Sequence, residues 1–139
     1  MPIFASHNLH NSLIRALELQ ISDSFHTSTG EKSEIDIIVG LESRGFLFGP
    51  TLALRLGAGF VPVRKQGKLP GECETEAFKK EYGEDHFQMQ SDAIKAGAKV
   101  VVVDDIIATG KSVCTIPGGT VGSRRELVLA TALSTFGSD

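Results

Sequence analysis

The sequence has few of the features that mark secreted proteins and zinc-binding domains. It holds only two cysteines, Cys73 and Cys114, which lie far apart in the chain. We expect both to be free thiols in a reducing compartment. Four histidines are present, but they form no zinc pattern with the cysteines. His7 and His10 are three residues apart, yet no other ligand type lies near them in sequence.

An excess of charge and a long hydrophobic run are also missing. The formal net charge is -3, with 41% hydrophobic and 22% charged residues, an ordinary globular balance. This composition predicts no surface for nucleic acid or for a membrane. No window approaches the ~20 apolar residues of a membrane span, and the first residues lack a signal-peptide pattern. We therefore expect a soluble protein of the cytoplasm, with the nucleus as the alternative.

Apolar periodicity predicts an alternation of helices and strands within one domain. The chain of 139 residues is long enough for a core without disulfides. The expected elements are a helix over 8–21, a loop over 22–33, a buried strand over 35–41, a helix over 46–56, a strand over 59–64, a long mobile loop or hairpin over 65–83, a short strand over 87–90, a helical turn over 91–97 and a strand over 99–104.

This order of elements predicts an α/β fold, with a mostly parallel sheet flanked by helices. Pro62 lies inside one predicted strand, which favours an edge or irregular position for that strand. In parallel sheets, ligands bind at the carboxyl ends of the strands. Polar clusters follow three of the predicted strands there, at 42–45, from 64 onward and from 104 onward. No repeat or low-complexity segment interrupts the pattern.

The segment VVVDDIIATGKS, residues 101–112, ends in a Gly-Lys-Ser that resembles a nucleotide-binding loop. A Walker loop has the pattern G-x-x-x-x-G-K-[ST]. In that register its first glycine falls on Asp105, whose carboxylate would repel phosphate. Only 27 residues follow Ser112, since the chain ends at 139, too few for the rest of an NTPase domain. The sequence therefore disfavours a Walker loop.

A sugar-phosphate site explains the same segment better. The small residues 108–110 allow backbone N–H groups to approach a phosphate, and a helix beginning near Ser112 would direct its positive end there. The carboxylates of Asp104 and Asp105 can accept hydrogen bonds from a diol. Together these groups fit a ribose 5-phosphate. The alternative is a strand that simply ends in a solvated acidic turn.

These motifs carry a resemblance to a known family. VVVDDIIATG resembles the phosphoribosyl-pyrophosphate (PRPP) motif of type I phosphoribosyltransferases. GLESRGFLFGPTLA, RKQGKLPGE and KEYG resemble the adenine phosphoribosyltransferases, most closely the fungal forms, which disfavours a transferase for another base. The match runs from about Pro2 to Gly110. It predicts a type I phosphoribosyltransferase core over 1–112 and a divergent tail over 113–139.

The resemblance implies transfer of a phosphoribosyl group from PRPP to adenine, which gives AMP and pyrophosphate with Mg²⁺ in purine salvage. The metal would be held mainly through the substrate pyrophosphate, with the two adjacent aspartates as candidate ligands. The implied substrate contacts are Asp104 and Asp105 for the ribose hydroxyls, Ala108, Thr109, Gly110, Lys111 and Ser112 for the 5′-phosphate, and Ser43, Arg44, Arg64, Lys65 and Lys68 for the pyrophosphate.

Two residues are implied to act in the chemical step. Arg44 would face the departing pyrophosphate, whose growing charge must be neutralised as its bond to the sugar breaks. Glu81 would be a general acid or base near the adenine ring, beside Tyr82 in the same block. The alternative interpretations are a surface carboxylate for Glu81 and a solvated basic loop for 64–68.

The chain departs from the family pattern in three places. It begins late, Lys111 stands where the family usually has glycine, and the resemblance stops after about Ser112. The tail would contribute one short helix or strand over 125–133, and we expect an exposed apolar face beside 100–103. A non-catalytic PRPP- or nucleotide-binding module, or an inactive isoform that pairs with a full-length subunit, is the alternative function. The family is usually dimeric, which implies a homodimer.

Overall fold

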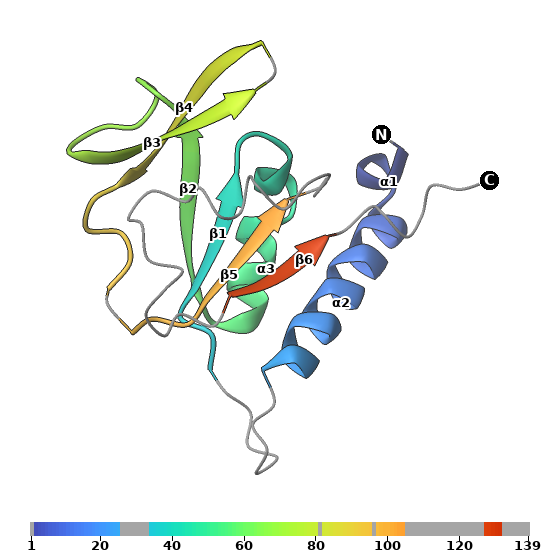
Figure 1. The fold of residues 1–139 in the computed structure, drawn as a ribbon. Coiled ribbons are helices and arrows are strands. Elements are labelled where there is room, and N and C mark those ends of the chain that lie inside the picture. The colour runs from blue at the N-terminus through green and yellow to red at the C-terminus, as the bar shows by residue number, and fades with distance from the viewer. Residues whose placement is uncertain (1, 26–33, 81, 96, 105–126, 132–139) are drawn as a thin grey trace.

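The computed structural model describes residues 2–25, 34–80, 82–95, 97–104 and 127–131 (Figure 1). In chain order, the elements are α1 (Pro2–Ala5), α2 (His7–Ser24), β1 (Ile37–Leu41), the 3₁₀ helix η1 (Arg44–Leu47), α3 (Gly49–Leu56), β2 (Gly59–Lys65), β3 (Cys73–Lys80), β4 (Gly83–Gln90), β5 (Val100–Asp104) and β6 (Leu127–Thr131).

The strands form one mixed sheet in the order β3-β4-β2-β1-β5-β6. β1 pairs in parallel with β2 and β5, and β5 pairs in parallel with β6. β4 runs antiparallel to both β2 and β3. The predicted α/β class with a mostly parallel sheet is confirmed. Because β1, β2, β5 and β6 are mutually parallel, their carboxyl ends lie at one edge of the sheet.

α2 and α3 cover one face of the sheet (Figure 1). The buried stripe of α2 consists of Leu13, Ile14, Leu17 and Ile21, the spacing of an amphipathic helix. The predicted helix over 8–21 is thus confirmed, and it extends at both ends. It begins one residue after Ser6, whose Oγ accepts a hydrogen bond from the Leu9 N–H at 3.4 Å.

The predicted helix over 46–56 is present but divided in two. η1 forms the first part, and α3 begins at Gly49 with Pro50 in its first turn. Proline suits this place because the first helical N–H groups have no acceptor within the helix. The helix ends at Gly57, which has a left-handed φ of 69°. Phe48, between the two helices, is completely buried in the core.

A second apolar cluster lies on the other face of the sheet. It is built mainly from valines of β1, β2 and β5 together with Met89 of β4. The valines at 100–103 are at most 4% exposed, so the expected exposure of an apolar face beside them is wrong at these residues. β6 pairs with β5 along that strand's whole length, from Val100 to Asp104. The tail therefore contributes a strand, one of the two forms predicted for 125–133.

The predicted long loop over 65–83 is mostly a β-hairpin. β3 and β4 pair from Cys73↔Gln90 to Lys80↔Gly83, so from residue 73 onward the hairpin, one of the two predicted forms, is confirmed. This hairpin is rich in charged residues, and its apolar residues do not alternate strongly with polar ones. For this reason the sequence also allowed a loop. The helical turn predicted over 91–97 forms no helix among the described residues of that range. They make isolated turns and bends, one of them closed by a hydrogen bond from Ala93 N to Gln90 O.

β2 is an interior strand although it contains Pro62. The proline lies opposite Gly40 of β1, and β4 pairs with β2 only at Arg64 and Lys65. No ladder bond to β4 is therefore required at residue 62, and the expected edge position is wrong for the strand as a whole. Among the helices that the structure describes, none combines the length and the hydropathy of a membrane span. Cys73 is a free thiol, as expected, and Cys114 lies outside the described residues.

Candidate functional site at the carboxyl ends of the parallel strands

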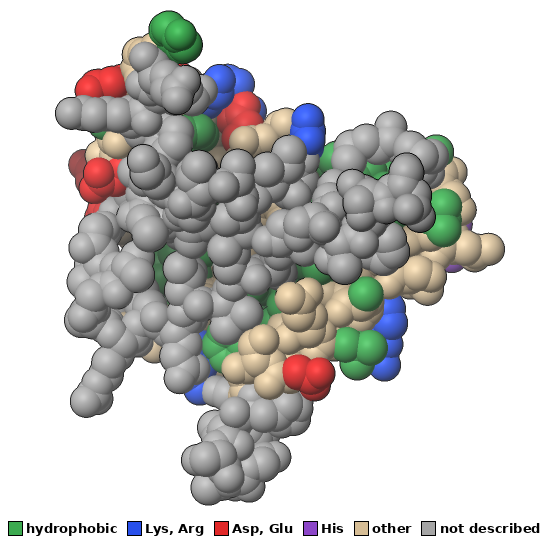
Figure 2. Space-filling model, turned by 45° about the vertical axis from the view of Figure 1, so that its right-hand side comes forward, with side chains coloured by type: hydrophobic (Ala, Val, Ile, Leu, Met, Phe, Trp, Pro, Cys, Tyr) green, Lys and Arg blue, Asp and Glu red, His purple; other side chains and the backbone are tan. Residues whose placement is uncertain are grey.

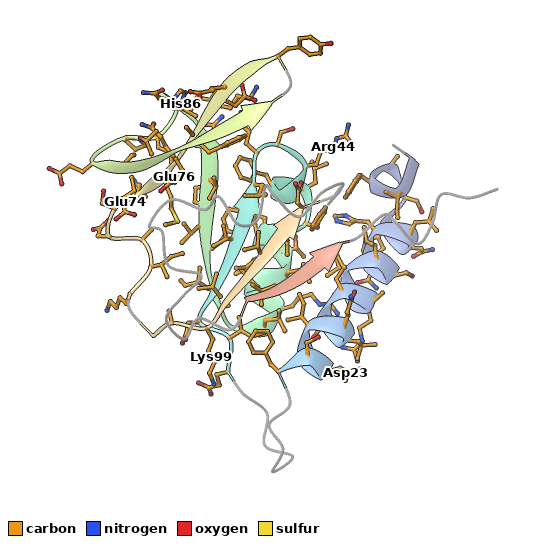
Figure 3. All side chains as sticks on the ribbon, viewed as in Figure 1. Asp23, Arg44, Glu74, Glu76, His86 and Lys99 are labelled. Atoms are coloured by element: carbon orange, nitrogen blue, oxygen red, sulfur yellow. The ribbon has the colours of Figure 1, made fainter. Side chains whose placement is uncertain are left out.

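The carboxyl ends of β1, β2 and β5 bring three of the predicted segments together. β1 lies between the other two strands, with Leu41 opposite Val63 and Gly40 opposite Val103. η1 follows β1 directly and contacts β5. Figure 3 shows Arg44 at the end of the molecule that carries the β3–β4 hairpin, whereas Lys99 lies at the opposite end. The predicted pyrophosphate and ribose segments therefore share one edge of the sheet.

Two close backbone approaches hold η1 at this edge. A Cβ atom on Gly45 would lie 2.5 Å from the carbonyl oxygen of Val103, so no other residue fits there without movement. A Cβ on Gly40 of β1 would lie 3.2 Å from the carbonyl oxygen of Gly45, in addition to 2.8 Å from the ring of Phe60. These glycines allow η1 to pack directly on β5. Arg44, next to Gly45, is exposed at the surface of the site.

A basic segment at the end of β2 is organised around one carboxylate. Lys68 Nζ lies 2.6 Å from Glu42 Oε1, and the backbone N–H of Lys65 donates to Glu42 Oε2 at 2.9 Å. Arg64 Nε lies 3.4 Å from the same Oε2, at ion-pair distance but without the alignment of a hydrogen bond. The Glu42 side chain is only 12% exposed. The structure therefore brings the predicted Arg64, Lys65 and Lys68 together.

The electrostatic setting keeps Glu42 ionised. Burial raises the pKa of its carboxyl, but the hydrogen bonds from Lys68 and from the Lys65 backbone, with the charge of Lys68 and the contact with Arg64, outweigh that effect. The net result is a pKa below the ordinary value of 4.5. At neutral pH the carboxylate is thus a fixed negative charge within a basic segment.

Of the remaining predicted site residues, the structure describes Asp104, Ser43 and Tyr82. Asp104 ends β5 at this edge and is half-buried, and Ser43 is exposed on the turn after β1. Tyr82, directly before β4, is 96% exposed. This exposure favours a surface location for the Tyr82 ring over a place in a preformed substrate pocket. Glu81, Asp105 and the predicted phosphate-loop residues lie outside the described part of the chain: Ala108, Thr109, Gly110, Lys111 and Ser112.

The hairpin extends this edge of the site. Lys65, the last residue of β2, pairs with Phe87 of β4. Because β4 runs antiparallel to β2 and begins at Gly83, its first four residues lie beyond the end of β2. At about 3.4 Å per residue, the hairpin extends roughly 14 Å beyond the end of β2. Figure 2 shows acidic and basic side chains close together at the hairpin end of the molecule. The hairpin thus forms a charged wall on one side of the strand ends.

Glu42 is the residue that sequence reasoning missed. Its segment was recognised as a polar cluster, but only Ser43 and Arg44 were assigned roles. A signal was present, because an acid directly follows β1 while Arg64, Lys65 and Lys68 follow the end of its parallel neighbour β2. Residues after adjacent parallel strand ends are spatial neighbours, so an ion pair was predictable there.

The chemistry of this edge suits a polyanion. Among the described residues, no group of three or more His, Cys, Asp or Glu side chains could hold a metal ion. The cationic side chains of Arg44, Arg64, Lys65 and Lys68 are the donors that phosphate oxygens require. Asp104 adds a carboxylate oxygen, which suits either a sugar hydroxyl or a hard cation. These residues fit Mg²⁺ carried in by a phosphate group better than Mg²⁺ in a protein cage.

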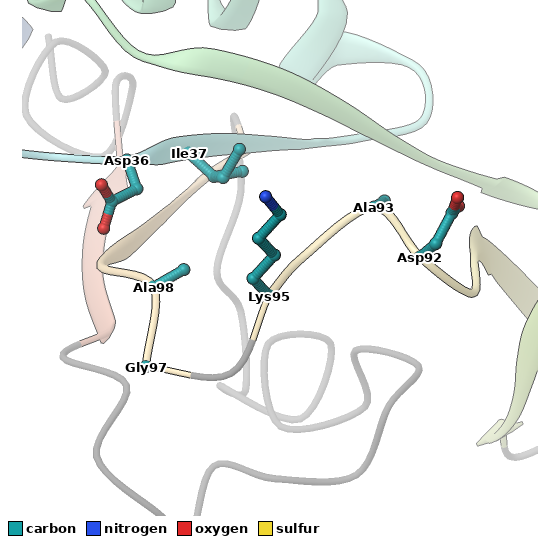
Figure 4. Close-up of a pocket in the computed structure, with 7 residues that line it drawn as sticks. All are labelled: Asp36, Ile37, Asp92, Ala93, Lys95, Gly97 and Ala98. Carbon is teal, nitrogen blue, oxygen red and sulfur yellow. The ribbon is translucent and has the colours of Figure 1, made fainter.

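A pocket of about 370 Å³ lies at the other edge of the sheet. Figure 4 shows the Lys95 side chain extending toward β1 between Asp36 and Asp92. One oxygen of Asp36 already accepts a hydrogen bond from the Lys99 N–H at 2.8 Å. This pocket lies at the amino end of β1 and includes none of the predicted site residues.

Comparisons with known proteins agree with this arrangement. The chain matches the family model of the phosphoribosyl transferase domain over residues 6–117. It is 52% identical to an adenine phosphoribosyltransferase of Debaryomyces hansenii over 131 residues, 94% of this chain and 61% of that protein. It is 58% identical to adenine phosphoribosyltransferase 1 of Saccharomyces cerevisiae over 81% of this chain and 57% of the relative. The chain thus spans about 60% of the length of these curated relatives.

Solved structures give the same result. The adenine phosphoribosyltransferase of Saccharomyces cerevisiae, complexed with an imino-altritol bisphosphate and adenine, superposes with a TM-score of 0.79 at 50% identity. The match covers 92% of this chain and 73% of that one. A Trypanosoma brucei enzyme in complex with AMP, pyrophosphate and ribose-5-phosphate matches with a TM-score of 0.69 at 27% identity, over 91% of this chain and 53% of that one. From its sequence motifs, its sheet and these matches, the chain belongs to the phosphoribosyltransferase family.

Proposed function

We propose that this chain binds PRPP and adenine and transfers the phosphoribosyl group to the base, which gives AMP and pyrophosphate. The observation that carries the proposal is the meeting of Arg44, the basic segment Arg64–Lys68 and Asp104 at one sheet edge. Basic side chains suit the pyrophosphate of such a substrate, and a neighbouring carboxylate suits its ribose hydroxyls. The names of the relatives support adenine as the accepting base.

The proposed step forms one bond and breaks one. A ring nitrogen of adenine attacks the anomeric carbon of PRPP, and the bond from that carbon to the pyrophosphate oxygen breaks with its electron pair. Negative charge builds on the leaving pyrophosphate, and in this proposal Arg44 and Lys68 stabilise it. The proton lost by adenine passes to a general base, the role proposed for Glu81 on the basis of the family resemblance.

The sugar is oriented by the end of β5 in this proposal. Asp104 accepts hydrogen bonds from the ribose hydroxyls together with Asp105, and residues 108–112 receive the 5′-phosphate. When bound, Mg²⁺ would neutralise charge on the pyrophosphate. It would enter with the substrate, with Asp104 and Asp105 as its candidate protein ligands. The wall formed by the hairpin would exclude water from the reacting carbon on that side.

Product formation tests the proposal directly. The purified chain is mixed with PRPP, adenine and Mg²⁺, and AMP is followed by chromatography while PRPP binding is measured by calorimetry. The proposal predicts both binding and turnover. Binding without AMP would favour the non-catalytic module instead, and absence of binding would contradict the proposed function altogether.

The homodimer and the cytoplasmic location also belong to this proposal. Leu47 and Leu54, on η1 and α3, are 45% and 84% exposed. Exposed leucines on neighbouring helices are compatible with a surface that a second copy covers. Light scattering during gel filtration would give the mass of a dimer, about twice 14.8 kDa. A monomeric mass at micromolar concentration would contradict the dimer.

A further inference from the structure

Glu42 occupies a special place in the β1–β2 pairing. Its own N–H donates to Val63 O at 3.0 Å, which continues the parallel ladder one residue beyond β1. The next β2 donor that faces this side is the Lys65 N–H, and the Glu42 carboxylate accepts it in place of a backbone carbonyl. The side chain thus supplies the last rung of the ladder.

The opposite side of the basic segment is tied to β4. Gln66 N donates to His86 O at 2.9 Å, and Gly67 N donates to Gln88 Oε1 at 3.0 Å. Since β4 holds one side and Glu42 the other, the segment is fixed on both sides before any ligand binds. The contacts from Glu42 carry charge, whereas those from β4 come from a backbone carbonyl and a neutral amide.

The Glu42 carboxylate binds the basic segment but uses only part of its hydrogen-bond donors. Arg64, Lys65 and Lys68 lie within five residues of chain, and three like charges at this spacing repel one another. One buried negative charge offsets part of that repulsion. Lys68 stays 47% exposed, and an ammonium has three donors, of which Glu42 uses one. The other donors remain available to phosphate oxygens.

We propose that Glu42 is a positioning residue, which holds Arg64, Lys65 and Lys68 in the arrangement that receives the pyrophosphate of the substrate. The inference rests on the proposed function and assigns to this chain a residue on which its affinity for pyrophosphate depends. The inference predicts that removal of Glu42 weakens PRPP binding. A carboxylate that merely competed with the phosphates for the cations would instead lower PRPP affinity. Its removal would then tighten binding. An ordinary surface ion pair would change nothing.

The test compares two ligands that differ in the pyrophosphate. PRPP and AMP are titrated calorimetrically, without turnover, into the wild-type chain, Glu42→Gln and Glu42→Ala. We expect Glu42→Ala to weaken PRPP binding by ten-fold or more while AMP affinity changes less than two-fold. Glu42→Gln should give an intermediate loss, since its amide oxygen can still accept from Lys65 N but carries no charge. A purely structural role would weaken both ligands equally.

A matched control removes a comparable ion pair elsewhere. Glu18 is 18% exposed and lies 3.0 Å from Arg55 Nε and 3.1 Å from Arg15 Nη1 on the helical face. Glu18→Gln should leave affinity for PRPP and AMP within two-fold of wild type. Amide hydrogen exchange at Lys65 supplies a ligand-free readout, and it should accelerate in Glu42→Ala but not in Glu18→Gln. If Glu42→Ala fails to fold, Glu42→Gln carries the test.

The outcomes separate the inference from the proposed function. If wild type binds PRPP and both Glu42 variants bind it equally well or more tightly, the inference is overturned while the proposed function stands. If wild type binds no PRPP, the proposed function fails, and pyrophosphate alone is titrated into the same variants. Weaker pyrophosphate binding in Glu42→Ala then supports the inference. Unchanged or absent pyrophosphate binding overturns it.

Discussion

Single residues set the geometry of this site, and Gly45 is the clearest case. Any side chain at this position meets the Val103 carbonyl, which belongs to the central part of the sheet and cannot move aside. We expect Gly45→Ala to destabilise the protein by about 1–3 kcal/mol through overpacking. The residue also lies next to Arg44, so PRPP affinity should fall as well. Urea denaturation followed by circular dichroism gives the free energy of unfolding.

Gly59→Ala is the control for that measurement. A Cβ there would lie 3.0 Å from the tip of the Ile37 side chain, which can rotate away. We expect a much smaller loss of stability and no change in PRPP affinity. Equal losses in the two variants would contradict the role of the Val103 contact, because backbone entropy by itself favours alanine over glycine.

The ionisation of Glu42 predicts a specific dependence of stability on pH. Its pKa in the folded protein lies below the ordinary value of 4.5. The carboxylate therefore contributes stability that is complete above about pH 4.5 and is lost as the pH falls through the lower folded pKa. Wild type should exceed Glu42→Gln in stability at neutral pH, and the difference should shrink in acid. Thermal melts between pH 2 and 7 would measure it, and a constant difference would refute the assignment.

At the scale of elements, α2 owes its position to one apolar face. Ile21 is completely buried against the sheet, whereas Leu19 on the same helix is 49% exposed. Ile21→Ala should lower the free energy of unfolding by about 2–5 kcal/mol. Leu19→Ala should change it by less than about 0.5 kcal/mol. Denaturant titration of both variants checks the pair, and similar losses would contradict the packing of this helix.

Elements also show where sequence patterns succeed and fail. The strand near 100–104 and the helix near 7–24 were predictable because their apolar residues follow the periods of buried elements. The hairpin was predicted only as the alternative to a loop, because its strands β3 and β4 are rich in charged residues and lack a strong apolar alternation. The edge position predicted from Pro62 was wrong for a different reason. Its strand is interior, but β4 pairs only with the last residues of β2.

At the scale of the molecule, the parallel connection of β1, β2 and β5 creates the site. Arg44, Lys65 and Asp104 are far apart in sequence, and only the shared direction of these strands brings their segments to one edge. The family motifs allowed each residue to be predicted. An ion pair between Glu42 and the basic segment was predictable from the adjacent strand ends. Its individual contacts, such as the 2.6 Å distance to Lys68, depend on side-chain placement that no motif encodes.

The acidic pair after β5 gives a prediction for the whole site. Asp104→Asn combined with Asp105→Asn should abolish measurable binding of both PRPP and AMP, because each ligand presents ribose hydroxyls. The thermal midpoint should stay within a few degrees of wild type, since the residues follow the buried part of the strand. Calorimetry with the two ligands checks this. Retained binding would show that the sugar lies elsewhere.

The most direct measurement is a PRPP titration followed by backbone amide NMR of the wild-type chain. If PRPP binds at the carboxyl ends of the parallel strands, the amide signals of Arg44, Lys65 and Asp104 shift with one common saturation curve. Those of Asp92 and Lys95, which line the pocket at the opposite edge, stay in place. Shifts confined to that pocket, with the strand ends unchanged, would contradict the account.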